Sequence, residues 1–450
     1  MGINSWLRSR RGLSLQTRRF GVGLAAFVMS AAVLAYLIRM SQFGAHGPAP
    51  AVVAALVIAV VAVAGAHRAG FWAILLGTFL VSLARFGPSS PTSIWTFADV
   101  FLVIGFALLI PQILDGRLQA PPMFVAGAVI LIVAGLAATT FSEAPFRSLG
   151  EMMRLVASAV MLPTAFLLWN PSRRKIVAVA GAYTCGSAFS TGYGLVTGLK
   201  TDDGRYAGLA EHPNGLGLTS MFSVALIPFL AAASGRERRW LWITLGAVNA
   251  VGVWVSGSRA ALLVLLVLLP IFPLVSRSAA GVGLLGFATA LGLLFADRLL
   301  NVEGGNALSR LLGAGSTAGS NADRGDRIDT VLAIIREHPL LGSGFIHSWY
   351  AHVTYLEIMA AAGLFGLIGF CAILLAADRT VLTAPHPFNL LAYPAVGYTI
   401  VGFATNVLWD RYIWIPISLS MLAWIHSRPD PDPDHEHEDA SQPQPTEARR

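Results

Sequence analysis

The sequence predicts an all-α integral membrane protein with about 12–14 transmembrane helices and one long extracytoplasmic loop that contains short helices. Hydrophobic residues make up 55% of the 450 residues, and charged residues make up only 12%. A soluble protein is about a quarter charged, so most of this chain is expected to contact lipid. The apolar residues also gather in runs of about 17 to 25 residues, the length that a helix needs to cross a bilayer.

The first expected span follows a basic N-terminus. Residues 1–19 contain several arginines, and an apolar run occupies 20–38. A cleaved signal peptide has a shorter apolar core and a small-residue cleavage site, so we interpret this run as a signal anchor that is not removed. Cytoplasmic segments collect Lys and Arg, which places the N-terminus in the cytoplasm.

The later spans follow from the same apolar runs. We place helices near 20–38, 50–66, 70–86, 97–114, 122–140, 148–169, 174–198, 213–233, 239–256, 259–276, 279–296, 352–376, 388–408 and 411–426. Basic clusters at 173–175 and 236–239 fall in inside loops, whereas the outside loop 87–96 has none. The charge bias and the even number of spans place the C-terminus in the cytoplasm as well. The turn at 256–259 and the final short pair leave the count open by two spans.

The chain divides into five parts on this topology. These are a basic cytoplasmic N-terminus (1–19), transmembrane helices 1–11 (20–296), an extracytoplasmic loop (297–351), transmembrane helices 12–14 (352–426) and a cytoplasmic tail (427–450). Within the loop, Ala322 to Glu337 has helical spacing with Ile328, Val331, Leu332 and Ile335 on one face, as a surface lid would have. The tail is rich in Pro, Asp, Glu and Gln and is expected to be disordered.

The net charge of +7 does not indicate nucleic-acid binding. The basic residues lie in short loops between apolar runs and form no continuous stripe. Cys185 and Cys371 each lie inside an apolar run. We therefore expect both to be small buried apolar residues, and not parts of a disulfide framework or a zinc site. The polar tail contains His435 and His437, but a solvated tail is favoured over metal binding. We expect no cofactor and no metal.

Titratable groups gather where the long loop meets the membrane. His338, His347 and His352 precede an apolar run that carries Tyr355 and Glu357. An imidazole that can act as a base near neutral pH is costly at this boundary unless it has a use. His352 stands at the start of the expected helix and is the favoured base. His347 is its nearest rival, and His338 precedes a proline and is assigned to a turn.

Two arginines are predicted on the same outer face as His352. Arg205 lies in a short polar loop with His212-Pro-Asn214, and Arg259 lies at the outer end of a span. A guanidinium binds phosphate oxygens two at a time, so such a pair suits a diphosphate that must be held and stabilised as a leaving group. The imidazole would take the proton from an attacking hydroxyl.

Each of these residues also has a structural interpretation. Arg259 is placed to snorkel to the outer head groups. Arg205 has Asp202 and Asp203 as neighbouring partners, and His352 is placed to cap a helix. The adjacent aspartates alone are a weak metal signal.

Three other charged groups lie close to the ends of the expected spans. Asp99, at the start of a span, is expected to cap it. Glu151 and Arg154 are spaced to pair on one helix face.

Several motifs carry a resemblance to a known family. In chain order they are Arg205-Tyr-Ala-Gly-Leu209 with His212-Pro-Asn214, Ser256-Gly-Ser-Arg-Ala-Ala261, Asp326-Arg327, Glu337-His-Pro-Leu-Leu-Gly-Ser-Gly-Phe345, His352-Val-Thr-Tyr-Leu-Glu357 and Gly363-Leu-Phe-Gly366. Over about residues 95–410 the chain resembles the O-antigen ligase and O-antigen polymerase superfamily, which are polytopic bacterial membrane glycosyltransferases.

The resemblance implies an inverting, metal-independent glycosyltransferase. Such an enzyme moves a glycan from undecaprenyl diphosphate to an acceptor hydroxyl on the extracytoplasmic face. By motif, Arg205 and Arg259 would bind the diphosphate and His352 would activate the acceptor. The supporting candidates are Arg327, His347, Asn214, Tyr355 and Glu357. Val353 stands where the family usually has Asn, which leaves the acceptor open.

The expected partners are a polyprenyl-diphosphate-linked glycan donor, a glycan or lipid acceptor, and the lipids of the bacterial inner membrane. The sequence does not distinguish a ligase from a polymerase, because the two activities differ only in the acceptor. The alternative class is a transporter or flippase of a lipid-linked glycan, which would carry internal pseudo-symmetry and charges in mid-membrane. A polyprenyl-phosphate sugar transferase usually has an acid in its first outer loop, and residues 40–50 contain none.

Overall fold

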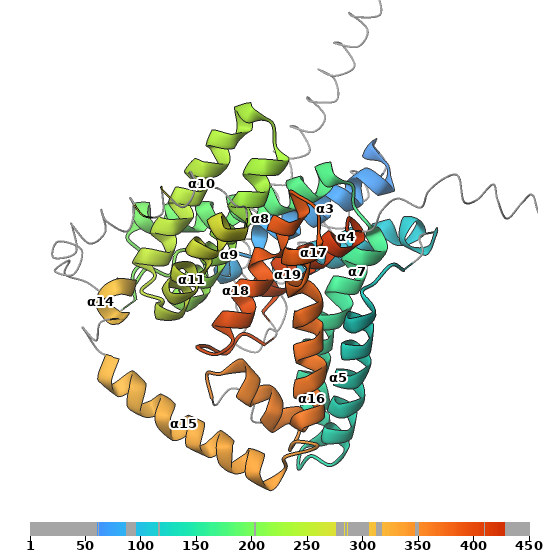
Figure 1. Ribbon diagram of the computed structural model, residues 1–450, viewed down its shortest axis with the longest axis vertical. Coiled ribbons are helices and arrows are strands. Elements are labelled where there is room, and N and C mark those ends of the chain that lie inside the picture. Colours follow the sequence, from blue (N-terminus) through green and yellow to red (C-terminus); the bar gives the residue numbers. More distant parts are fainter. Residues whose placement is uncertain are drawn as a thin grey trace, which may run out of the picture.

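The protein is all-α throughout the part of the chain that the structure describes. The computed structural model describes residues 61, 63–86, 96–115, 118–201, 204–275, 283, 286, 306–311, 317–346, 351–408 and 410–427. These residues form helices joined by short turns (Figure 1), and the only strand-like pairing among them is one isolated bridge between Lys200 and Tyr206.

Five helical stretches are long and apolar enough to cross a membrane. They lie in α4 (Phe97–Asp115), α5 (Pro122–Thr140), the continuous run α6 (Pro145–Val156), η2 (Ala157–Met161) and α7 (Leu162–Trp169), α9 (Pro213–Ala233), and α16 (Thr354–Asp378) with α17 (Thr380–Thr383). Shorter apolar helices are α11 (Arg259–Val275), η3 (Phe388–Ala392) with α18 (Tyr393–Val401), and α19 (Arg411–Ile425). Helices of this length and composition are typical of an integral membrane protein.

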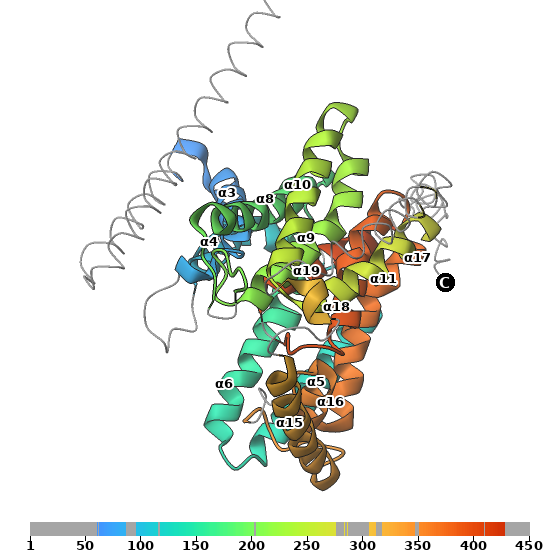
Figure 2. The ribbon, with the colours of Figure 1, turned by 90° about the vertical axis from the view of Figure 1, so that its left-hand side faces the viewer.

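The remaining helices are less apolar or shorter. They are α3 (Ala66–Leu80), η1 (Ala84–Phe86), α8 (Arg173–Thr197), α10 (Arg236–Val255), α14 (Ala307–Leu311) and α15 (Thr317–Glu337). α8 and α10 each begin with a basic cluster, and α8 buries several hydroxyl side chains against its neighbours. Both helices pack beside α9, as Figure 2 also shows.

α19 forms the centre of the main helical body. Every residue from Ile413 to Ala423 is buried. A helix that is apolar on all sides is stable only when other helices surround it, and here α7, α9, α16 and α18 contact it. Trp414 Nε1 donates a hydrogen bond to the Leu408 carbonyl at 2.6 Å, so the start of α19 is fixed to the preceding loop.

Most described helices agree with the sequence prediction. The predicted spans 97–114, 122–140 and 213–233 match α4, α5 and α9 closely. Prolines at the first turn of α5 and α9 mark their starts, since proline has no N–H to lose there. The predicted spans 20–38 and 279–296, and most of 50–66, lie outside the described residues, apart from single positions. The predicted span 70–86 is shifted, because α3 ends at Leu80 and a turn follows.

The predicted span 352–376 matches α16, whereas the predicted span 388–408 needs correction. α16 is bent, because Gly363 has φ 66° and ψ −168°, a conformation that glycine alone adopts without strain. A Cβ at this position would lie 2.1 Å from the Leu340 carbonyl oxygen, so the bend is built against the preceding turn. α18 ends at Val401, and residues 402–408 form a loop rather than the end of a span.

α15 packs against α16, and in Figure 1 it runs obliquely towards the lower end of α16. Val331 and Ile335 on this helix are buried against Ala351 and Ala360, so the predicted apolar face of 322–337 is confirmed. The turn after α15 is fastened to α16, since Gly344 N donates to the Ala361 carbonyl at 3.0 Å. This turn therefore lies against α16 at its bend.

Candidate functional site

A polar cavity of about 340 Å³ lies where the starts of α9, α16 and α19 meet. Of the predicted residues, His212, Asn214 and His352 line it. The other polar or charged residues of its described lining are Ser82, Thr96, Glu211, Thr219, Thr405, Asn406, Asp410, Arg411 and Tyr412. Two imidazoles, a guanidinium and two carboxylates thus surround one space.

His352 is held at the cavity by the loop that follows α18. Its backbone has φ 50°, which is uncommon for a residue with a side chain, and the residue is half-buried. The next turn of chain is anchored twice: Thr354 N donates to the Gly402 carbonyl at 2.8 Å, and Thr354 Oγ1 donates to the Thr405 carbonyl at 2.9 Å. A strained backbone with such anchors is typical of a residue that is held for a function.

Arg205 does not line the cavity but contacts Asn214, which does. Its side chain is buried, its Nε donates to the Ser256 carbonyl at 2.8 Å, and its Nη2 donates to Asn214 Oδ1. His212 caps α9, because its Nδ1 accepts a hydrogen bond from Asn214 N at 3.1 Å. His212 therefore has a structural role at the start of α9, and Arg205 determines where the Asn214 amide lies.

Arg259 is the first residue of α11 and follows the turn at 256–258. This turn packs closely on α9, since a Cβ at Gly217 would lie 2.5 Å from Ser258 Cβ. Arg310 Nη1 in α14 donates to the Gly257 carbonyl at 3.0 Å and holds the turn from the other side. The structure thus brings the Arg205 and Arg259 segments together, although neither guanidinium is part of the described lining of the cavity.

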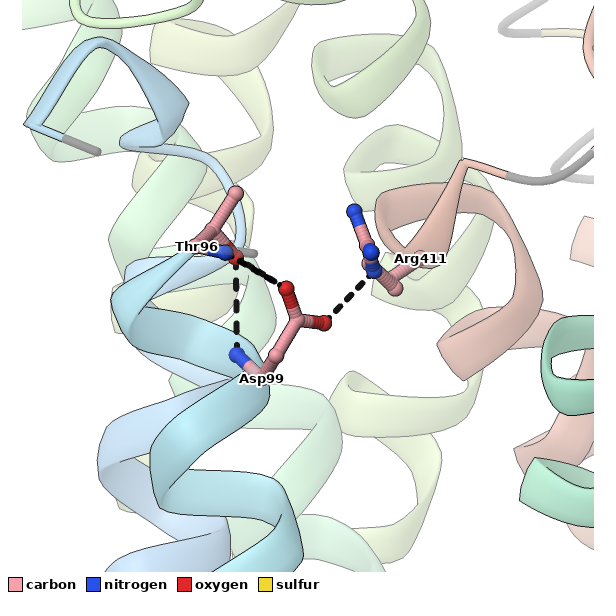
Figure 3. A network of polar contacts seen from close by, with 3 residues as sticks. All are labelled: Thr96, Asp99 and Arg411. Carbon is pink, nitrogen blue, oxygen red and sulfur yellow. Dashed lines mark hydrogen bonds and ion pairs between the residues drawn. The ribbon is translucent and has the colours of Figure 1, made fainter. Parts of the chain in front are cut away.

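Arg411 is the guanidinium that lines the cavity, and the sequence did not single it out. Its Nε forms an ion pair with Asp99 Oδ1 at 2.6 Å (Figure 3). The other carboxylate oxygen of Asp99 accepts hydrogen bonds from Thr96 N at 2.7 Å and from Thr96 Oγ1 at 2.8 Å. Asp99 therefore caps the start of α4, as predicted, and in addition fixes Arg411.

Asp410 is a second residue that the sequence did not single out. It precedes α19 and accepts a hydrogen bond from the Tyr412 hydroxyl at 3.3 Å. Burial raises the pKa of the Asp410 carboxyl to about 6, although the neighbouring Arg411 opposes this rise. A polar Asp-Arg pair directly before an apolar run was the available signal, but such pairs also occur at ordinary span ends.

The supporting candidates lie in different places. The Tyr355 hydroxyl donates to the Thr399 carbonyl at 2.7 Å, so it ties α16 to α18. Glu357 is buried near the backbone amides of Ala351 and His352, without a hydrogen bond of ordinary geometry. Arg327 lies half-buried on α15 and is not part of the described cavity lining. His347 lies outside the described residues.

Other expectations concern metals and thiols. Among the described residues, no group of three or more His, Cys, Asp or Glu side chains gathers as a metal site would. Cys185 is half-buried and Cys371 is exposed, and both are thiols without a disulfide partner. Glu151 and Arg154 form the predicted pair on one helix face, with Arg154 Nη1 at 2.8 Å from Glu151 Oε2.

No protein-family model and no curated protein matches this chain. The resemblance to the O-antigen ligase and polymerase superfamily stays a prediction.

Proposed function

We propose that this protein is a membrane glycosyltransferase that resembles the O-antigen ligases and polymerases. It would transfer or polymerise a glycan from an undecaprenyl-diphosphate-linked donor onto an acceptor hydroxyl. The observation that supports this most is the single cavity that His352, Asn214 and Arg411 line together. A base, a hydrogen-bonding amide and a cation in one space are the groups that this reaction needs.

The proposed step is an inverting displacement at the anomeric carbon of the donor sugar. The acceptor hydroxyl gives its proton to the His352 imidazole, and its oxygen forms the new bond to that carbon. The bond from the anomeric carbon to the diphosphate oxygen breaks at the same time, and the electron pair leaves with the polyprenyl diphosphate. A guanidinium stabilises the charge that develops on this leaving group.

The arginines are assigned different tasks in this proposal. Arg411 lines the cavity, so we assign it direct contact with the diphosphate. Arg205 and Arg259 are the diphosphate ligands that the resemblance implies. The buried hydrogen bonds of Arg205 to Asn214 and Ser256 give it a positioning task as well.

The proposed topology follows from the sequence. We propose 12–14 spans, cytoplasmic termini and an active site on the extracytoplasmic face of the bacterial inner membrane. The residues 297–351 would form the outer loop that carries α14 and α15, and 352–426 would contain the last spans. The charge bias of the loops supports this orientation.

The experiment that tests the function uses purified protein in proteoliposomes with a polyprenyl-diphosphate-linked glycan and a candidate acceptor. We expect release of polyprenyl diphosphate together with a product that carries the glycan. The alternative, a transporter or flippase, predicts that the lipid-linked glycan crosses the bilayer intact. If the donor crosses the bilayer intact and is not cleaved with any acceptor, the protein is a transporter and the proposed glycosyltransferase activity is wrong.

A further inference from the structure

A second, apolar groove of about 700 Å³ opens between α4 and the run α6, η2 and α7. Leu102, Val103, Phe106, Ile110 and Ile113 line it along α4. These residues span roughly 20 Å of helix together with Asp99, at 1.5 Å per residue. Residues on its rim, such as Val103 and Met161, are more than half exposed. The groove is thus long, apolar and open along its side.

The opposite wall of the groove contains a π-helical turn. η2 (Ala157–Met161) interrupts the run between α6 and α7, and Ala157, Ser158 and Met161 line the groove. A π-turn inserts an extra residue into a helix and is frequently found at functional sites. Small side chains at Ala157 and Ser158 leave space beside α4, so the groove is built into the wall of this helix.

One end of the groove is charged. Asp99, Arg154 and Arg411 line that end, whereas the rest of the described lining is mostly apolar. Asp99 holds Arg411 at 2.6 Å and Glu151 holds Arg154 at 2.8 Å. Two oriented guanidiniums at the head of an apolar groove match a ligand that has an anionic head and a long apolar chain.

The groove and the polar cavity share Arg411. This residue lines both spaces, and its partner Asp99 lines the groove while Thr96, bonded to Asp99, lines the cavity. Figure 3 shows these three side chains and the hydrogen bonds and ion pair that link them. A ligand whose phosphates contact Arg411 can therefore place its chain in the groove and its sugar in the cavity that His352 lines.

We infer that this groove binds the isoprenoid chain of the lipid-linked donor, with the diphosphate at Arg411 and Arg154. This assignment rests on the proposed function, because it places the donor relative to His352. An acyl chain of the acceptor is disfavoured as the occupant, since the acceptor hydroxyl must approach from the side of the cavity opposite the leaving group. Because Arg411 lines both the groove and the cavity, we assign the groove to the chain of the donor.

The test measures binding rather than turnover. Wild-type protein in proteoliposomes is titrated with polyprenyl diphosphate, with neutral polyprenol and with inorganic diphosphate. Ala107→Trp fills the groove from the exposed face of α4, and Ala126→Trp on the exposed face of α5 is the matched control. We expect Ala107→Trp to weaken polyprenyl diphosphate binding by more than about tenfold and to leave inorganic diphosphate binding unchanged. We expect the control to bind as the wild type does.

A photoreactive polyprenyl diphosphate locates the chain independently of any substitution. Crosslinks are expected on α4 and on 157–162, and wild-type affinity in Ala107→Trp or crosslinks confined to other helices would overturn the inference. Groove binding without any glycan transfer would instead leave the inference standing and count against the proposed function.

Arg154→Gln tests the head-group site. This substitution is expected to weaken the binding of polyprenyl diphosphate and to leave the binding of polyprenol unchanged. Equal losses of affinity for both lipids would show that Arg154 does not bind the diphosphate.

Discussion

Arg205 Nη2 donates a hydrogen bond to Asn214 Oδ1 at the start of α9, and this bond ties the polar loop to the wall of the cavity. The same guanidinium reaches the Ser256 carbonyl through Nε at 2.8 Å. One side chain thus fixes two of the segments that carry the family resemblance. Since the Asn214 amide lines the cavity, a change at Arg205 is expected to reach the site even without direct contact with a substrate.

Arg205→Lys tests this relationship because it keeps the positive charge and loses the planar fork. A lysine ammonium cannot replace both hydrogen bonds with the same geometry, and buried hydrogen bonds to charged groups contribute about 1.5–3 kcal/mol each. We expect glycan transfer to fall by about ten- to a hundredfold, with lower thermal stability in detergent. Arg174→Lys, at the start of α8, is the control. Full activity and stability in Arg205→Lys would contradict the proposal that Arg205 positions Asn214.

Asp410→Asn tests the buried carboxyl before α19. The folded pKa of about 6 lies above the ordinary value of 3.8, so the folded protein binds this proton more tightly than the unfolded chain does. Stability contributed by this group is therefore present below pH 3.8 and is lost as the pH rises towards 6. We expect Asp410→Asn to raise the melting temperature at pH 8 but not at pH 4.

The measurement is the difference in melting temperature between Asp410→Asn and the wild type across this pH range. Taking the difference isolates Asp410 from the other acidic groups. The Tyr412 hydroxyl keeps an acceptor in the variant, because an Asn side chain also carries an oxygen. A difference that does not change with pH would show that the Asp410 carboxyl titrates normally.

Gly363→Ala tests the bend in α16. The substitution places a Cβ 2.1 Å from the Leu340 carbonyl oxygen and forces a positive φ on alanine. We expect a loss of at least about 1–3 kcal/mol in folding free energy, seen as a lower melting temperature and lower yield of inserted protein. Gly192→Ala in α8 is the control, since a Cβ there meets nothing within 4 Å and alanine favours the helix. Equal stability of the two variants would contradict the described bend.

The sequence predicted the apolar helices well because their signals are local. α5 and α9 begin at prolines and continue for a full membrane thickness of apolar residues, so both ends could be read directly. The bend at Gly363 was missed because an alanine-rich run is typical of a continuous helix. Its cause, the Leu340 carbonyl, approaches from a turn before the helix, and no local pattern carries that contact.

For a similar reason, the sequence could single out only some of the residues that line the cavity. His352 and Asn214 could be found from their place at the polar ends of apolar runs, and both line the cavity. Arg411 could not be separated from an arginine that snorkels at a span end. Its significance comes from Asp99 on α4 and from the two spaces that it lines, which depend on how distant helices pack.

We propose that His352 removes the proton from the acceptor hydroxyl. The direct test is the rate of glycan transfer by His352→Asn, with His338→Asn as the control at an exposed histidine of the same loop. Asparagine tolerates a positive φ better than alanine does, so this substitution suits the backbone at φ 50° while removing the base. We predict a loss of more than about a hundredfold for His352→Asn with normal membrane insertion, and wild-type rates for the control. Wild-type transfer by His352→Asn would contradict the assignment of His352 as the base.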